Sequence, residues 1–99
     1  MAPQIDVDRD AIARFCRQNR IRWMALFGSV LRDDFRQDSD VDVLVDFEPE
    51  TRIGLVGLAQ LELDLEDLFG RQVDLSTFEG LNPHFRDRVL AEARDLYAA

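Results

Sequence analysis

The segment at residues 40–46 constrains the fold of this chain more than any other. Val41, Val43 and Val45 alternate with polar positions that include Asp40 and Asp42. Such alternation is typical of a β-strand, in which successive side chains point to opposite faces of a sheet. A register slip of one residue would bury the aspartates, so we expect the valine face to be covered and the register to be rigid.

Apolar spacing and helix-ending residues predict the other elements. In chain order we expect a helix at Asp8–Asn19 capped by Asp6 or Asp8, a strand at Trp23–Phe27, a short helix within Val30–Phe35, the valine strand, a helix from Gly54 to Phe69 stopped by Gly70, a strand at Gln72–Ser76, and a helix opened by Asn82 and Pro83. The order αβαβαβα predicts an α/β domain of α+β type, one unit over residues 1–99, with the direction of each strand pair left open.

Several apolar residues are expected in the core. In the leucine-rich helix these are Leu55, Leu58, Leu61, Leu65, Leu68 and Phe69, and in the last helix Phe85, Val89, Ala93 and Leu96. Trp23, Phe27 and Cys16 are assigned to the core as well, and Tyr97 to helix packing. Val56 and Leu63 lie off the leucine stripe. They mark either a partner surface or extra burial under the last helix.

Composition excludes several classes of protein. Twenty acidic and twelve basic residues give a net charge of -8, which argues against direct binding of nucleic acid. All basic residues are arginine, which excludes the P-loop lysine and Schiff-base chemistry. His84 and Cys16 are the only residues of their types, so neither a zinc cluster nor an intramolecular disulfide is expected. Without a signal-like or membrane-spanning apolar run, a soluble cytoplasmic protein is expected.

Aspartates in two strands form a candidate metal site. Asp40 and Asp42 leave the same face of a strand, with Cα atoms roughly 6.5 Å apart. Paired carboxylates repel one another unless a cation lies between them, and oxygen ligands favour Mg²⁺ or Mn²⁺. Asp74, between Val73 and Leu75, offers a third carboxylate. Three carboxylates suit phosphoryl or nucleotidyl transfer, in which one of them also serves as a base.

A glycine-serine pair follows the first strand. Gly28 permits a tight turn, and the Ser29 hydroxyl would lie beside the first amides of a short helix. Helix N-termini bind phosphate oxygens well because their amide groups are unsatisfied. On its own such a pair is usually an ordinary turn, and an Asp-x-Asp is usually solvated acidity. Their spacing is the informative feature.

From residue 28 to 45 the chain reads GSVLRDDFRQDSDVDVLV. This string resembles the signature of the nucleotidyltransferase superfamily, and in so short a chain it is similar to the minimal nucleotidyltransferases, or MNT proteins. The resemblance implies a small mixed sheet flanked by helices. It also implies that Gly28 and Ser29 contact nucleotide phosphates, that Asp40 and Asp42 bind Mg²⁺, and that Asp74 binds metal or activates the acceptor hydroxyl.

The loop after Ser29 departs from the family pattern. Arg32 is retained, whereas Asp33 stands where glycine is common. The role of Arg32 is left open between a phosphate contact and an ion pair with Asp33 or Asp34.

Stand-alone MNT proteins resemble the antitoxin half of HEPN/MNT toxin–antitoxin pairs. The resemblance implies a hetero-oligomer in which AMP passes from ATP to a tyrosine of a HEPN ribonuclease toxin, with a carboxylate-bound Mg²⁺. Two alternatives are kept. One is a catalytically idle antitoxin that acts by binding alone, and the other is the nucleotide-binding subunit of a two-chain enzyme that modifies a small molecule.

Overall fold

A computed structural model describes residues 8–28 and 40–98 of the chain. The elements are α1 (Arg9–Gln18), β1 (Ile21–Phe27), β2 (Val41–Phe47), α2 (Leu55–Phe69), β3 (Val73–Thr77), α3 (Pro83–Glu92) and β4 (Arg94–Ala98). The short helix predicted within Val30–Phe35 lies outside the described residues. No helix of the described part is long and apolar enough to cross a bilayer.

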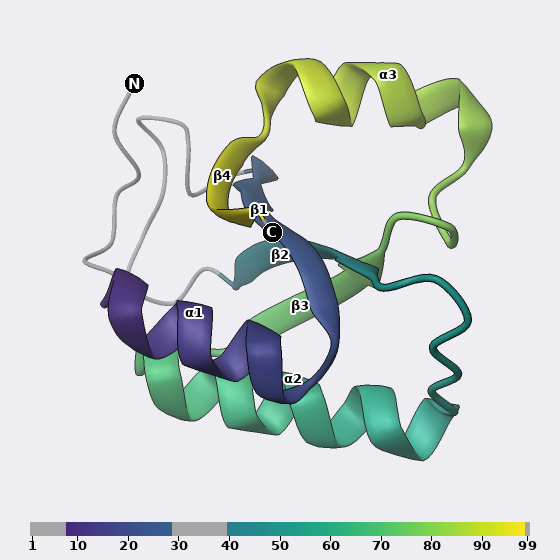
Figure 1. The fold of residues 1–99 in the computed structure, drawn as a ribbon. Helices are drawn as coiled ribbons and strands as arrows, with labels where there is room; N and C mark the ends of the chain where they lie inside the picture. The colour runs from purple at the N-terminus through teal and green to yellow at the C-terminus, as the bar shows by residue number, and fades with distance from the viewer. Residues whose placement is uncertain (1–7, 29–39, 99) are drawn as a thin grey trace.

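The four strands form one mixed sheet in the order β3-β2-β1-β4. β2 and β3 are parallel, and β1 runs antiparallel to both β2 and β4. Figure 1 shows α1 and α2 on one side of the sheet and α3 on the other. The predicted fold class, a small mixed sheet flanked by helices, is confirmed.

The valine face of β2 is the centre of the core. Val41, Val43 and Val45 are fully buried, as the alternation predicted. They pack with residues of α1, α2 and β1 in a single cluster. Leu44, on the opposite face, is also fully buried. The middle of β2 is therefore covered on both sides, and its polar side chains lie near its two ends.

The predicted helix boundaries hold for α1 and for the end of α2. The Asp8 side chain accepts a hydrogen bond from the Ala11 amide at 3.1 Å, which caps α1. Gly70 has a left-handed backbone with φ of 68° and closes α2 with a hydrogen bond to the carbonyl of Glu66. Cys16 is fully buried, as expected.

Only part of the predicted leucine stripe on α2 is buried. Leu61 and Leu65 are in the core, but Leu55 is 86% exposed and Leu68 is 43% exposed, so the prediction was wrong for these two. Fifteen helical residues span about 22 Å, whereas the five residues of β3 span about 17 Å, so α2 extends beyond the strand it covers. Val56 and Leu63 are exposed as well, which contradicts burial under the last helix.

Two glutamates of α2 hydrogen-bond to the outer strand β3. The Glu66 carboxylate accepts from the amide of Val73 and the Glu62 carboxylate from the amide of Leu75, each at 3.2 Å. The two glutamates are four residues apart and therefore lie on one face of the helix. They satisfy backbone donors that point away from β2.

The C-terminal segment differs from the prediction. The last helix was expected to carry Leu96 on the same face as Phe85, but α3 ends at Glu92 and Arg94–Ala98 form β4. Phe85 is 56% exposed, whereas Leu96 is buried from β4. Pairing with the outer edge of β1 supplies hydrogen bonds that a continued helix would leave unmade, and it overrides the local helical spacing.

Three aromatic residues also lie in surroundings that differ from the prediction. Trp23 is only half-buried, and its indole N–H donates to the Asp95 carboxylate on β4 at 2.7 Å. Phe27 is half-buried too, so the assignment of both residues to the core was only partly right. Tyr97 packs against the core from β4 rather than from a helix.

Because Leu96 is buried from β4 and Phe85 is exposed on α3, we expect their alanine substitutions to differ in their effect on stability. Leu96→Ala should lower the free energy of unfolding by about 2–5 kcal/mol, because it opens a cavity in the core. Phe85→Ala should lower it by less than about 1 kcal/mol, because that ring is mostly exposed. Urea titrations of both variants measure the difference. Equal losses would contradict the boundary between α3 and β4.

The buried thiol gives a second prediction. Burial raises the pKa of Cys16 from its ordinary 9.0 to about 12, against a smaller opposing effect of the Arg17 charge. Because the folded protein holds the neutral thiol, this group's contribution to stability is intact below pH 9 and is lost as pH rises towards 12. In urea titrations, the free energy of unfolding of Cys16→Ala should therefore fall less than that of the wild type as the pH rises above 9. Native protein should also resist thiol labelling at about pH 8 until it unfolds, and rapid labelling would contradict this assignment.

Candidate active site

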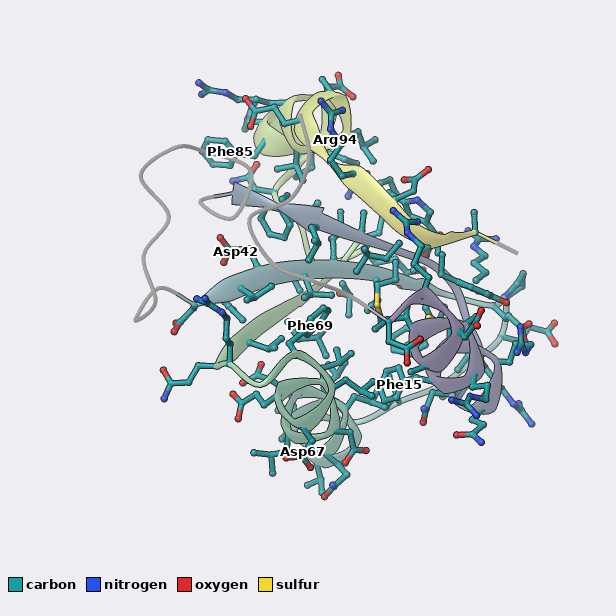
Figure 2. The ribbon with its side chains drawn as sticks, turned by 90° about the vertical axis from the view of Figure 1, so that its left-hand side faces the viewer. Phe15, Asp42, Asp67, Phe69, Phe85 and Arg94 are labelled. Carbon is teal, nitrogen blue, oxygen red and sulfur yellow. The ribbon has the colours of Figure 1, made fainter. Side chains whose placement is uncertain are left out.

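The parallel pairing of β2 and β3 places two predicted site residues side by side. Asp42 is the Cα partner of Asp74 across the pair. Neighbouring strands lie about 4.8 Å apart, and directly paired residues share one face of the sheet. Asp42 is half-buried and Asp74 is exposed. In Figure 2 Asp42 lies on the side of the sheet away from Phe69 and α2.

Asp40 is the residue immediately before β2. It is exposed, and the hydrogen bond from the Val41 amide to the carbonyl of Gln72 starts the β2–β3 pairing just after it. Asp40 therefore lies at the same end of the two strands as Asp42 and Asp74. This end is open to solvent on the side of Asp40 and Asp74.

Gly28 contacts the carboxylate of Asp42 from the end of β1. Phe27 is the Cα partner of Asp42, so the next residue of β1 turns over that side chain. Gly28 has φ of 76°, and a Cβ atom at this position would clash with Asp42 Oδ2. Any side chain at this position would displace the carboxylate. Glycine is thus required here for backbone conformation and for space.

The charges of the site favour a divalent cation. Like charges directly opposite each other on adjacent strands are destabilising, which applies to Asp42 and Asp74. Their oxygen donors are those that Mg²⁺ prefers, and the lack of a side chain at Gly28 leaves space for one oxygen of Asp42 beside the turn. The donor set therefore fits a magnesium ion. Asp40 and Asp42 would hold it, and Asp74 is the adjacent carboxylate.

The described side chains do not form a complete metal cage. Within residues 8–28 and 40–98, no three His, Cys, Asp or Glu side chains are arranged to hold a metal ion together. A shared role for Asp40, Asp42 and Asp74 as ligands therefore stays a prediction. Ser29 and Arg32, the predicted phosphate contacts, lie outside the described residues.

A cavity at the opposite end of the sheet was not predicted. It has a volume of about 740 Å³ and lies between the segment that follows β2 and the one that follows β3. The available signal was the charged stretch Glu48–Arg52 around Pro49, which sequence reasoning treated only as the end of a strand.

Comparison with known proteins agrees with the geometry. The family model described as a nucleotidyltransferase domain matches residues 9–96. The protein adenylyltransferase MntA of Thermococcus cleftensis is 40% identical over 72 residues, which are 73% of this chain and 71% of that protein. A candidate protein adenylyltransferase of Methanocaldococcus jannaschii is 34% identical over 76 residues, 77% of this chain and 80% of the relative.

Solved structures share the fold. A protein described as a candidate minimal nucleotidyltransferase superposes with a TM-score of 0.71 at 41% identity, covering 87% of this chain and 86% of that one. A toxin–antitoxin complex with AMP-PNP superposes with a TM-score of 0.76 at 19% identity, covering 94% and 75% of the two chains. The complex of a tri-AMPylated Shewanella oneidensis HEPN toxin with its MNT antitoxin gives 0.67 at 18% identity, covering 92% and 70%. The match of the family model over nearly the whole chain, together with the 41% identical structure, shows that this chain belongs to the nucleotidyltransferase domain family.

Proposed function

We propose that this chain is an antitoxin-type protein adenylyltransferase, which transfers AMP from ATP to a tyrosine hydroxyl of a cognate HEPN ribonuclease toxin. The observation that carries the proposal is the pairing of Asp42 with Asp74 beneath the Gly28 turn. The relatives named as protein adenylyltransferases support protein modification as the reaction class. Solved complexes of similar fold with a HEPN toxin and with AMP-PNP support the partner and the donor.

In the proposed reaction the acceptor oxygen attacks the α-phosphorus of ATP. A bond forms between that oxygen and the α-phosphorus, the bond from the α-phosphorus to the bridging oxygen breaks, and pyrophosphate leaves. Asp74, which is exposed beside Asp42, takes up the hydroxyl proton. Positioning and charge stabilisation provide most of the catalysis in such transfers.

The remaining site residues orient the nucleotide. Bound magnesium would neutralise charge on the phosphates and on the leaving pyrophosphate. Asp40 and Asp42 would hold it, and Gly28 would leave room for the phosphate chain above the Asp42 carboxylate. Ser29 follows Gly28 directly and Arg32 is four positions after it, and both are assigned to the phosphates on the strength of the motif.

The first test of the proposed site removes the charge of Asp42. With α-labelled ATP, Mg²⁺ and the cognate toxin, Asp42→Asn should lower label transfer by about a hundredfold or more, because the metal site loses a charged ligand. Asp87→Asn, an exposed aspartate of α3, is the matched control and should transfer label normally. Full transfer by the Asp42 variant would refute the site. If the wild type and the Asp42 variant inhibit the toxin equally and neither transfers label to it, an antitoxin that acts by binding alone is favoured.

The second test fills the space at Gly28 with a side chain. Gly28→Ala should lower transfer by about tenfold or more, because the new methyl group pushes the Asp42 carboxylate out of position. Gly70→Ala is a matched control for backbone strain, since Gly70 has φ of 68° and nothing within 4 Å of an added Cβ. Both variants should lose about 1–2 kcal/mol of stability in urea titrations. Normal transfer by a folded Gly28 variant would show that this close approach is not needed.

A further inference from the structure

The cavity at the far end of the sheet has an apolar floor. Phe47 at the end of β2, Leu58 of α2 and Phe78 after β3 line it. Arg86 contacts the Phe78 part of this floor. Its guanidinium lies 4.9 Å from the centre of the Phe78 ring and donates to the carbonyl of Leu81. A volume of about 740 Å³ is large enough to enclose several side chains of a partner.

The rim of this cavity is acidic. Asp46 is paired with Arg22, with the guanidinium 2.7 Å from the carboxylate, so these two charges cancel. The other charged lining residues are Glu48, Glu50, Glu79 and Arg52, which leave a net charge of −2. Among the described residues, none of the three glutamates has a side-chain hydrogen bond or ion pair. The rim therefore presents carboxylates that are available to a cation.

Two exposed aliphatic residues adjoin the cavity. Leu55 and Val56 follow Gly54, which lines the cavity, and each is 86% exposed. They begin α2, at the lower right of Figure 1, beside the segment that carries the glutamates. Large aliphatic side chains this exposed, next to an acidic rim, are typical of a surface that a partner covers.

We propose that this end of the molecule docks a partner segment that combines basic and apolar side chains. An arginine or lysine of the partner lays its aliphatic stem on Phe47 and Phe78 and brings its charge to the rim glutamates. Apolar neighbours of that residue cover Leu55 and Val56. This inference rests on the proposed function only for the identity of the partner, the HEPN toxin.

Charge distinguishes this partner from a second copy of the chain. A contact of the same surface on two copies would bring the rim glutamates of one copy against those of the other, in a chain of net charge -8. A basic segment removes that repulsion and forms opposite-charge contacts instead.

The docking surface and the carboxylates lie at opposite ends of β2. Phe47 is five positions after Asp42, which is about 16 Å along a strand. Substitutions at one end should therefore leave the chemistry of the other end intact. Binding of the partner and transfer of AMP become separable measurements.

The test compares partner binding by three variants in calorimetry with the cognate HEPN toxin. Glu48→Gln with Glu79→Gln should weaken binding by about tenfold or more, and the wild-type affinity should fall with added salt. Glu50→Gly removes a third carboxylate at a residue with φ of 69°, so weaker binding by this variant cannot result from added backbone strain. Glu92→Gln, at an exposed glutamate of α3, is the control for the loss of one carboxylate, as in Glu50→Gly, and should bind normally.

Asp42→Asn separates this inference from the proposed function. Normal binding by Asp42→Asn with weaker binding by the rim variants supports the docking surface, whether or not label is transferred. Wild-type affinity in the rim variants overturns the docking surface and leaves the proposed function standing. If the toxin does not bind at all, a fluorescent synthetic helix of leucine, alanine and arginine becomes the probe. If the helix binds and the rim substitutions weaken that binding, the inference is supported. If the helix does not bind, or if light scattering shows that the chain self-associates through this face, the inference is overturned.

Discussion

The site depends on the register between β2 and its two neighbours. Val41, Val43 and Val45 are committed to the core, so the aspartates must lie on the other face. That register places Asp42 opposite Phe27 on one side and opposite Asp74 on the other. The energy of apolar burial thus holds two like charges on adjacent strands, an arrangement that the carboxylates alone would not maintain.

The turn after β1 adds the second constraint. In a sheet, the residue that follows a strand end usually has space for any side chain, but Gly28 lies directly over an Asp42 oxygen. Strand pairing and this turn therefore fix the carboxylate from two directions. The result is a preorganised anionic site formed by a small number of residues, in keeping with a chain that has a single core.

Local patterns predicted the parts of this fold that depend on local physics. The alternation of β2, the Asp8 cap and the Gly70 stop all follow from residues close in sequence. The position of Leu96 on a strand does not follow from nearby residues, because it depends on pairing with the open edge of β1, which local spacing does not indicate. The aspartate spacing predicted that Asp42 and Asp74 lie on strands, but their direct pairing and the contact between Gly28 and Asp42 needed the register of neighbouring strands. Similarly, the acidic-rimmed cavity joins segments that follow β2 and β3, about thirty residues apart, and neither segment indicates it alone.

The glutamates that cover β3 restrict how a substrate can approach. An exposed outer strand normally accepts an extended peptide as an additional strand, through its free amide groups. Here Glu62 and Glu66 already occupy the amides of Leu75 and Val73, on either side of Asp74. Recognition by β-augmentation is therefore blocked next to Asp74. Under the proposed function, the acceptor hydroxyl would therefore arrive on a loop or a helix end of a folded partner rather than on an added strand.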